Sequence, residues 1–225
     1  MLLLAVDTST AQVSAAVVRV DDDASTSLVA SSETVAPNRH GELLAEAIHE
    51  ALTEAQVGWD EITAIAAGLG PGPFTGLRVG VMTATAIADA RGVPSYGVCS
   101  LDAIAEMHGP GRVLVCSDAR RKQVYWACYH DGRRVEGPEI GLPVDVGRHN
   151  AANADRAVGA GSVLHREAFA DFVVVESDAY PPAAEVARLA AGRTLARAPS
   201  ETLEPMYLRR PDAVPPGTPK AVTPT

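Results

Sequence analysis

A glycine- and proline-rich segment constrains the fold of this chain more than any other feature. Residues 62–69 form a short apolar run, typical of a buried strand, and Gly70-Pro-Gly-Pro-Phe-Thr-Gly76 follows it directly. A long apolar segment to Ala90 comes next, and then a second apolar run at residues 94–99. Two parallel strands need a crossover of about a dozen residues, usually a helix. The order strand, loop, helix, strand therefore predicts a βαβ unit and an α/β fold.

The predicted helix at residues 74–90 carries a stripe of small residues. Four of them recur at a spacing of four and so share one face of a helix: Gly76, Gly80, Ala84 and Ala88. A helix that is apolar on every side is expected to be buried on every side. Small residues let a second backbone approach closely through van der Waals contact. The stripe indicates either a core helix of this chain or a helix that faces a partner.

The chain before this unit predicts a meander and one helix. Apolar runs at residues 2–7 and 13–20, separated by a polar turn, predict a hairpin, and residues 27–33 predict a third strand. Residues 41–56 predict an amphipathic helix with Asn38 capping its start. Its apolar face would consist of Leu44, Ile48, Ala51, Leu52 and Ala55.

A break at His108-Gly-Pro-Gly-Arg112 divides the chain into two parts of similar pattern. After it, three strands are predicted at residues 113–117, 123–130 and 133–140, with Asp131-Gly132 as a hairpin turn, and an amphipathic helix at residues 183–197. We expect an N-terminal subdomain at residues 1–108, with part of the C-terminal helical region packing back on it. The expected C-terminal subdomain spans residues 109–210, and the proline-rich tail at 211–225 is expected to be disordered.

Charge and composition exclude several classes of protein. The 225 residues carry 28 acidic and 19 basic side chains, a formal net charge of −9, whereas a nucleic-acid-binding surface is normally basic. Aromatic residues make up 4%, so the core must close through Ala, Val, Leu and Ile. The three cysteines stand singly, and no run approaches the roughly 20 apolar residues of a membrane span. With no signal peptide evident, we expect a cytoplasmic protein.

Two segments offer groups that bind phosphate. Asp7-Thr-Ser-Thr10 lies at the end of the first strand, where a carboxylate can orient a metal-bound water and hydroxyls can hold phosphate. The Gly70–Gly76 loop opens a helix and can present backbone N–H groups to an anion. Turn capping uses the same residue types, and the loop is neither a Walker sequence nor GxGxxG. The nucleotide-binding candidates are Asp7, Thr8, Ser9, Gly70 and Gly72.

Other polar groups do not complete a site by sequence alone. His40 and Glu42 are too few ligands for zinc, so no metal site is predicted. Ser100 and Asp102 could form a hydrolase triad with a histidine, but no G-x-S-x-G context supports one. A basic group is interpreted as a solvated hairpin surface, with a tRNA contact left open: Arg120, Arg121, Lys122, Arg133 and Arg134.

Several motifs occur together in an order typical of one family. They are Leu4-Ala-Val-Asp-Thr-Ser9, His40-x-Glu-Leu-Leu44, Gly70-Pro-Gly-Pro-Phe-Thr-Gly-Leu-Arg-Val-Gly80, Asp118-Ala-Arg120 followed by Val124-Tyr-Trp-Ala127, and Pro205-Met-Tyr-Leu-Arg209. On these motifs the sequence resembles the TsaB (YeaZ) family of tRNA threonylcarbamoyladenosine biosynthesis proteins over about residues 1–210. The resemblance implies an actin/Hsp70/sugar-kinase-like (ASKHA) fold of two related α/β subdomains, with mixed sheets flanked by helices.

The resemblance also implies a function. A member of this family is expected to be a non-catalytic scaffold that dimerises with and activates a TsaD-like catalytic subunit, together with a TsaE-like ATPase, and meets tRNA only indirectly. Catalytic relatives hold a metal through a histidine pair, whereas Tyr96-Gly-Val-Cys-Ser-Leu-Asp-Ala103 contains no histidine. Thr8 and Ser9 stand where related ATPases have glycine, so the nucleotide site would be degenerate.

Two questions stay open on these grounds. No cofactor is expected, but ATP or ADP at an interface shared with the partner is not decided by the residues. The alternative function is an ASKHA-type ATPase or kinase with its own nucleotide site at Asp7, Thr8 and the glycine loop.

In this family the first two helices form the partner interface. Carried over to residues 41–56 and 74–90, the implied interface residues are Leu44, Ile48, Phe74, Gly76, Leu77, Gly80, Val81, Ala84 and Ala88. The same surface would form a homodimer when the partner is absent. The sequence does not decide the balance between homodimer and heterodimer.

Overall fold

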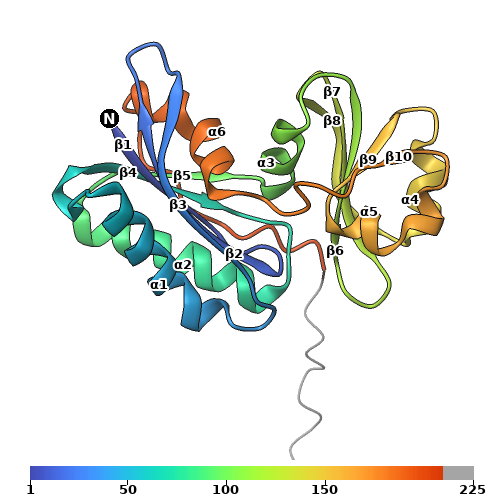
Figure 1. Cartoon of the computed structure of the whole chain (residues 1–225), viewed down its shortest axis with the longest axis horizontal. Coiled ribbons are helices and arrows are strands. Elements are labelled where there is room, and N and C mark those ends of the chain that lie inside the picture. Colours follow the sequence, from blue (N-terminus) through green and yellow to red (C-terminus); the bar gives the residue numbers. More distant parts are fainter. Residues whose placement is uncertain (210–225) are drawn as a thin grey trace, which may run out of the picture.

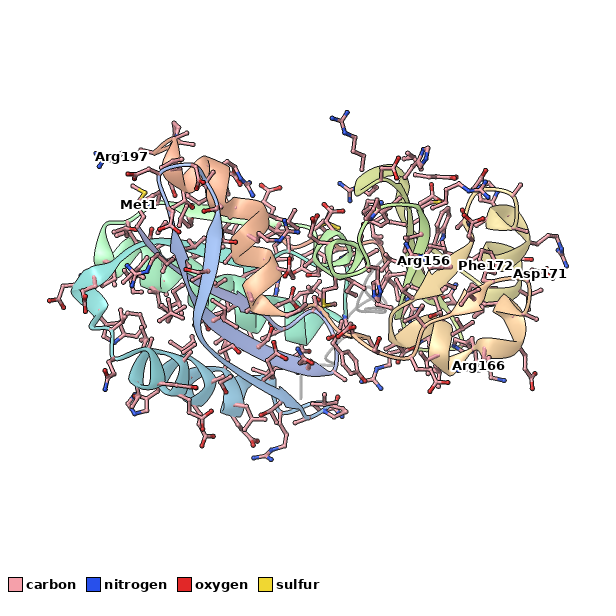
Figure 2. All side chains as sticks on the ribbon, turned by 45° about the horizontal axis from the view of Figure 1, so that its top comes forward. Met1, Arg156, Arg166, Asp171, Phe172 and Arg197 are labelled. Atoms are coloured by element: carbon pink, nitrogen blue, oxygen red, sulfur yellow. The ribbon has the colours of Figure 1, made fainter. Side chains whose placement is uncertain are left out.

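The chain folds into two subdomains, each built on a five-stranded sheet (Figure 1). The structure is a computed structural model and describes residues 1–209, so the tail predicted at 211–225 lies outside the described residues. Figure 2 shows Met1 and Arg197 at the outer end of one subdomain and Arg166 and Asp171 at the far end of the other.

The first sheet combines a meander with a parallel crossover. β1 runs antiparallel to β2, which pairs with β3, and β4 and β5 join on the other side of β1 in parallel. The strand order is β3-β2-β1-β4-β5. The bounds are β1 Leu2–Asp7, β2 Gln12–Val20, β3 Thr26–Val35, β4 Ile62–Gly68 and β5 Ser95–Val98. The predicted hairpin, third strand and βαβ unit are thereby confirmed.

The second sheet repeats this arrangement. Its order is β8-β7-β6-β9-β10, so in both sheets the third, second, first, fourth and fifth strands of the half lie side by side. The first two pair antiparallel and the first and fourth parallel, as in the first sheet. The bounds are β6 Arg112–Asp118, β7 Val124–His130, β8 Arg133–Gly141, β9 Arg156–Val158 and β10 Val173–Val174. The expected fold of two related mixed-sheet subdomains is confirmed.

Helices cover both faces of the first sheet, because successive apolar side chains of its strands point to opposite faces. Leu4 and Val6 of β1 face α1 (His40–Ala55) and α2 (Phe74–Arg91). Leu3 and Ala5 face α6 (Ala183–Leu195), which returns from the end of the chain to this sheet (Figure 1). The sheets therefore divide near residue 108, but α6 lies on the N-terminal side of the division.

The second sheet is covered by shorter elements. α3 (Ser100–Met107) packs on the face that carries Val113 and Val115. The opposite face carries Leu114 and Cys116 and meets α4 (Pro143–Asn150) and the 3-10 turn η2 (Arg166–Phe169). The remaining elements are the 3-10 turn η1 (Trp59–Glu61) and α5 (Ala160–Leu164). Within residues 1–209, no helix combines the length and apolar character needed to cross a membrane.

Two local predictions are wrong. Asn38 does not cap α1: the residue before the helix is Arg39, no side chain caps it, and Asn38 has a left-handed φ of 68° two residues upstream. The helix at 74–90 is not buried on every side, since Met82 is 63% and Phe74 44% exposed. Alanine, glycine and threonine make α2 look uniformly apolar in sequence, but only one of its faces meets the sheet.

Candidate functional site

The ends of three strands of the first sheet meet at Asp7. The carboxylate is 1% exposed. It accepts hydrogen bonds from the Ser9 amide and hydroxyl, both at 2.7 Å, and from the Ser100 hydroxyl. Ser100 follows β5, and its hydroxyl also accepts the Gly70 amide after β4 at 3.1 Å. Burial raises the pKa of Asp7, while these hydrogen bonds oppose the rise. Asp7 thus ties β1, β4 and β5 together.

The glycine loop packs against this turn and leaves no space between them. A Cβ on Gly72 would stand 2.0 Å from the Ser9 carbonyl oxygen, and one on Gly68 would stand 1.8 Å from a carboxylate oxygen of Asp7. The Gly70 amide is already bonded to Ser100, and Pro71 and Pro73 have no N–H. Of the two glycines predicted to approach a phosphate, Gly72 lies against Ser9 and Gly70 donates its amide to Ser100.

Thr8 occupies the groove of α2. Its hydroxyl donates to the Gly76 carbonyl at 2.7 Å and accepts from the Gly80 amide at 3.0 Å. These are the two groups that a regular α-helix joins directly. A Cβ on Gly80 would stand 2.4 Å from the Thr8 hydroxyl oxygen, and one on Gly76 would stand 2.7 Å from the Thr8 carbonyl oxygen. The small-residue stripe therefore admits the end of β1.

This placement corrects the predicted interface residues. Eight of the nine belong to the chain's own interior: Leu44, Ile48, Gly76, Leu77, Gly80, Val81, Ala84 and Ala88. Of the nine, Phe74 alone is exposed. The spacing correctly placed them on one face of each helix, but periodicity does not say what covers that face. In this protein the cover is the first sheet and the neighbouring helix.

A cleft of about 370 Å³ lies between the subdomains. Asp118 at the end of β6 lines it, as do Thr10, Pro73, Arg120 and Glu176. β6 is the first strand of its sheet, so Asp118 is the counterpart of Asp7. Asp7 is sealed in, whereas the Asp118 carboxylate is 33% exposed and accepts the Arg120 amide at 2.7 Å. This pairing of Asp7 and Asp118 was not predicted from the sequence, although an aspartate at the end of the first strand of each half was its signal.

The other candidate groups do not assemble into catalytic sets. Ser100 donates to Asp7, and Asp102 accepts from the Tyr129 hydroxyl at 2.7 Å, so each has a partner other than a histidine. His40 Nε2 lies 2.6 Å from the Thr10 carbonyl oxygen. Across residues 1–209 no group of three or more metal-ligating side chains forms. Burial raises the pKa of the Cys99 thiol to about 12, and the thiol is therefore protonated at neutral pH.

The predicted basic group is divided in two. Arg120 to Lys122 form the turn before β7, whereas Arg133 and Arg134 follow its end, so the length of a strand separates them. Arg134 lies 3.6 Å from Asp102. The turn itself has three successive left-handed residues, with φ of 61°, 52° and 59° at Arg120, Arg121 and Lys122.

We predict that Gly80→Ala lowers the free energy of unfolding by about 2 kcal/mol, because the new methyl group overlaps the Thr8 hydroxyl. The matched control is Gly192→Ala in α6, where a Cβ meets nothing within 4 Å; it should be neutral or stabilising by up to ~1 kcal/mol. Urea unfolding measures both. In the double variant Thr8→Ala/Gly80→Ala the loss should be smaller than the sum of the single losses. Strict additivity would contradict the insertion of Thr8.

We predict an unusual pH dependence at Asp7. Because burial raises its folded pKa above the ordinary value of 3.8, its contribution to stability is greatest below that pH and declines as the carboxyl ionises. Asp7→Asn cannot ionise. The stability of this variant relative to the parent should therefore increase as the pH rises above about 4, measured by urea unfolding at each pH. A relative stability that falls as the pH rises would contradict the dominance of burial over the hydrogen bonds that Asp7 accepts.

Comparison with curated proteins connects this chain to one pathway. Residues 29–190 match the family model "TsaD: tRNA N6-adenosine threonylcarbamoyltransferase". The chain is 32% identical over 196 residues to the tRNA threonylcarbamoyladenosine biosynthesis protein TsaB of Escherichia coli, covering 77% of this chain and 82% of that protein. An uncharacterised protein of Mycobacterium tuberculosis is 42% identical over 215 residues, 95% of this chain and 94% of its own length. A relative in Mycobacterium leprae is 41% identical, and the chain spans 56% of its length.

Solved structures agree with these relatives. A Pseudomonas aeruginosa protein described as similar to peptidase YEAZ superposes with a TM-score of 0.76 at 31% identity, covering 92% of this chain and 99% of that one. YeaZ from Pseudomonas aeruginosa gives 0.73 at 27% identity, covering 92% and 100%. Component A of (R)-2-hydroxyglutaryl-CoA dehydratase gives 0.52 at 10% identity, which shows a common ASKHA fold alone. The chain belongs to the TsaB (YeaZ) family of tRNA threonylcarbamoyladenosine biosynthesis proteins.

Proposed function

We propose that this protein is a non-catalytic subunit required for tRNA threonylcarbamoyladenosine formation. It would dimerise with and activate a TsaD-type catalytic subunit, in a complex that also contains a TsaE-type ATPase. The observation that carries the proposal is the closed turn at the end of β1. Asp7 and Thr8, the polar groups best placed to act on a nucleotide, are buried and hydrogen-bonded within the chain.

The closed turn argues against an ATPase or kinase with its own site. Such an enzyme needs backbone N–H groups that can reach a phosphate and a carboxylate that can reach the metal or water. Here Gly72 packs against the Ser9 carbonyl. The Thr8 hydroxyl donates to the Gly76 carbonyl in the first turn of α2, the helix whose N-terminus would face the phosphate. A chain whose nucleotide position is occupied by its own groups is better suited to binding a partner than to turnover.

The partner surface, in this proposal, is the outward side of α1 and α2. The two helices lie together on the same face of the first sheet (Figure 1). Their buried sides hold the core, so the partner would meet the exposed ones: Ala45 and His49 on α1, and Phe74, Arg78 and Met82 on α2. The chain itself matches the TsaD family model, so the catalytic subunit would present an equivalent pair of helices. The same surface would pair two copies when the partner is absent.

The charge distribution is consistent with an indirect role toward tRNA. The net charge is −9, and the two basic segments lie at opposite ends of β7 instead of forming one surface. The partner would carry the RNA and the metal. In this proposal the protein acts in the cytoplasm, where the complex with the TsaD-type subunit modifies tRNA.

We predict that Met82→Arg abolishes co-purification with the TsaD-type subunit and tRNA modification in a reconstituted assay, because it places a charge in the middle of the helix surface. Met82 is 63% exposed, so the substitution should not change the fold of the protein. Val173→Arg is the control: the residue is 66% exposed on β10 of the other subdomain and should leave both readouts unchanged.

Thermal melting of both variants separates a lost interface from lost folding. Full binding and full modification by a folded Met82→Arg protein would refute the assignment of the surface to α2. Modification at the same rate with and without this chain would refute the proposed function itself.

A further inference from the structure

The segment after α6, residues 198–209, forms a strap that leads from one edge of the first sheet to α2. It first follows β5. There the Glu201 amide donates to the Ser95 carbonyl at 2.9 Å, and the Glu201 carboxylate accepts a hydrogen bond from the Gly97 amide at 3.0 Å. The Met206 amide then bonds to the Leu69 carbonyl at 2.8 Å, beside the glycine loop. The strap thus covers the edge strand and delivers Tyr207 to the start of α2.

Tyr207 joins an aromatic and cationic cluster on the outer side of α2. Its ring centroid lies 4.9 Å from that of Phe74, and its hydroxyl accepts a hydrogen bond from Arg78 Nε at 3.1 Å. The Arg78 guanidinium lies 4.2 Å from the centroid of Phe74. Despite these contacts Phe74 is 44% and Tyr207 40% exposed. The three side chains hold one another in place while much of their surface faces solvent.

This cluster is continuous with the proposed interface. Phe74, Arg78 and Met82 are spaced by four and form one exposed ridge of α2, parallel to the buried glycine stripe. Aromatic residues and arginine are the side chains that contribute most to binding at protein interfaces. Because the two rings are already in contact, binding a partner would cost little conformational entropy in ordering them.

We propose that the strap completes the partner-binding surface and that Tyr207, Phe74 and Arg78 anchor the TsaD-type subunit; this rests on the proposed function. The partner face would combine apolar side chains for the rings with a carboxylate for Arg78, whose contacts in the described chain are a ring and a hydroxyl. α1 illustrates such a face in a protein of this fold, since Glu42, Glu46 and Glu50 are exposed at a spacing of four. A two-fold arrangement of two such folds would place a helix of this kind against α2.

The test compares variants of the full chain by titration against the purified TsaD-type subunit. Tyr207→Ala should weaken binding at least about tenfold with little change in melting temperature, because the ring is an exposed interface anchor. Tyr207→Phe keeps the ring and should stay within about threefold of the parent. Arg78→Glu should also weaken binding at least about tenfold, since it reverses the charge offered to the partner. The control is Trp59→Ala, a similarly exposed aromatic at 39% that should have no effect.

The outcomes separate this inference from the proposed function. Parent-like binding by a folded Tyr207→Ala protein, with binding abolished in Met82→Arg, would overturn the strap's role and leave the function standing. Weakened self-association with unchanged partner binding would assign the cluster to a second copy of this chain and also overturn it. If Tyr207→Ala fails to fold, Arg78→Glu decides between the outcomes by the same titration. Failure of the parent chain to bind the subunit would remove the function and the inference together.

Discussion

The packing of the first subdomain depends on one hydroxyl group, which bonds to the backbone of α2 between two glycines. Thr8 follows the last residue of β1, and its hydroxyl bridges the Gly76 carbonyl and the Gly80 amide. This contact requires that neither glycine carry a side chain. The contact fixes α2 against the central strand of its sheet and brings the glycine loop over Asp7 and Ser9. The buried stripe of α2 and the closed turn therefore depend on the same contact.

The aspartates at the ends of the two first strands have different surroundings. The sheets repeat the same strand order, and each first strand ends in an aspartate. Asp7 is buried with a raised pKa, whereas Asp118 still borders the space between the subdomains. The repeat is thus visible in the backbone, although only the first of the two aspartates is buried. The exposed side of α2, with the strap beside it, offers Phe74, Met82 and Tyr207 as large exposed side chains.

Much of the fold could be predicted from sequence because its signals are local. The hairpins and the βαβ unit follow from alternating apolar runs and from turns such as Asp131-Gly132, where both residues have positive φ. Part of the C-terminal helical region is expected to pack back on the first subdomain, but the face of the sheet that α6 covers could not be derived from its amphipathic pattern. The interface residues failed for that reason: Gly80 is small because Thr8 needs the space, and the sequence shows only that it is small. Ser100 as a partner of Asp7 depends on a contact across 93 positions.

The central claim is that the chain's own groups occupy its nucleotide position, so that it acts by binding a partner. The most direct measurement is a calorimetric titration of the isolated protein with ATP and Mg²⁺, repeated on Asp7→Ala. We expect no saturable binding by the parent, and therefore no difference between the two proteins. Micromolar affinity with one site per chain, lost together with ATP turnover in Asp7→Ala, would contradict it.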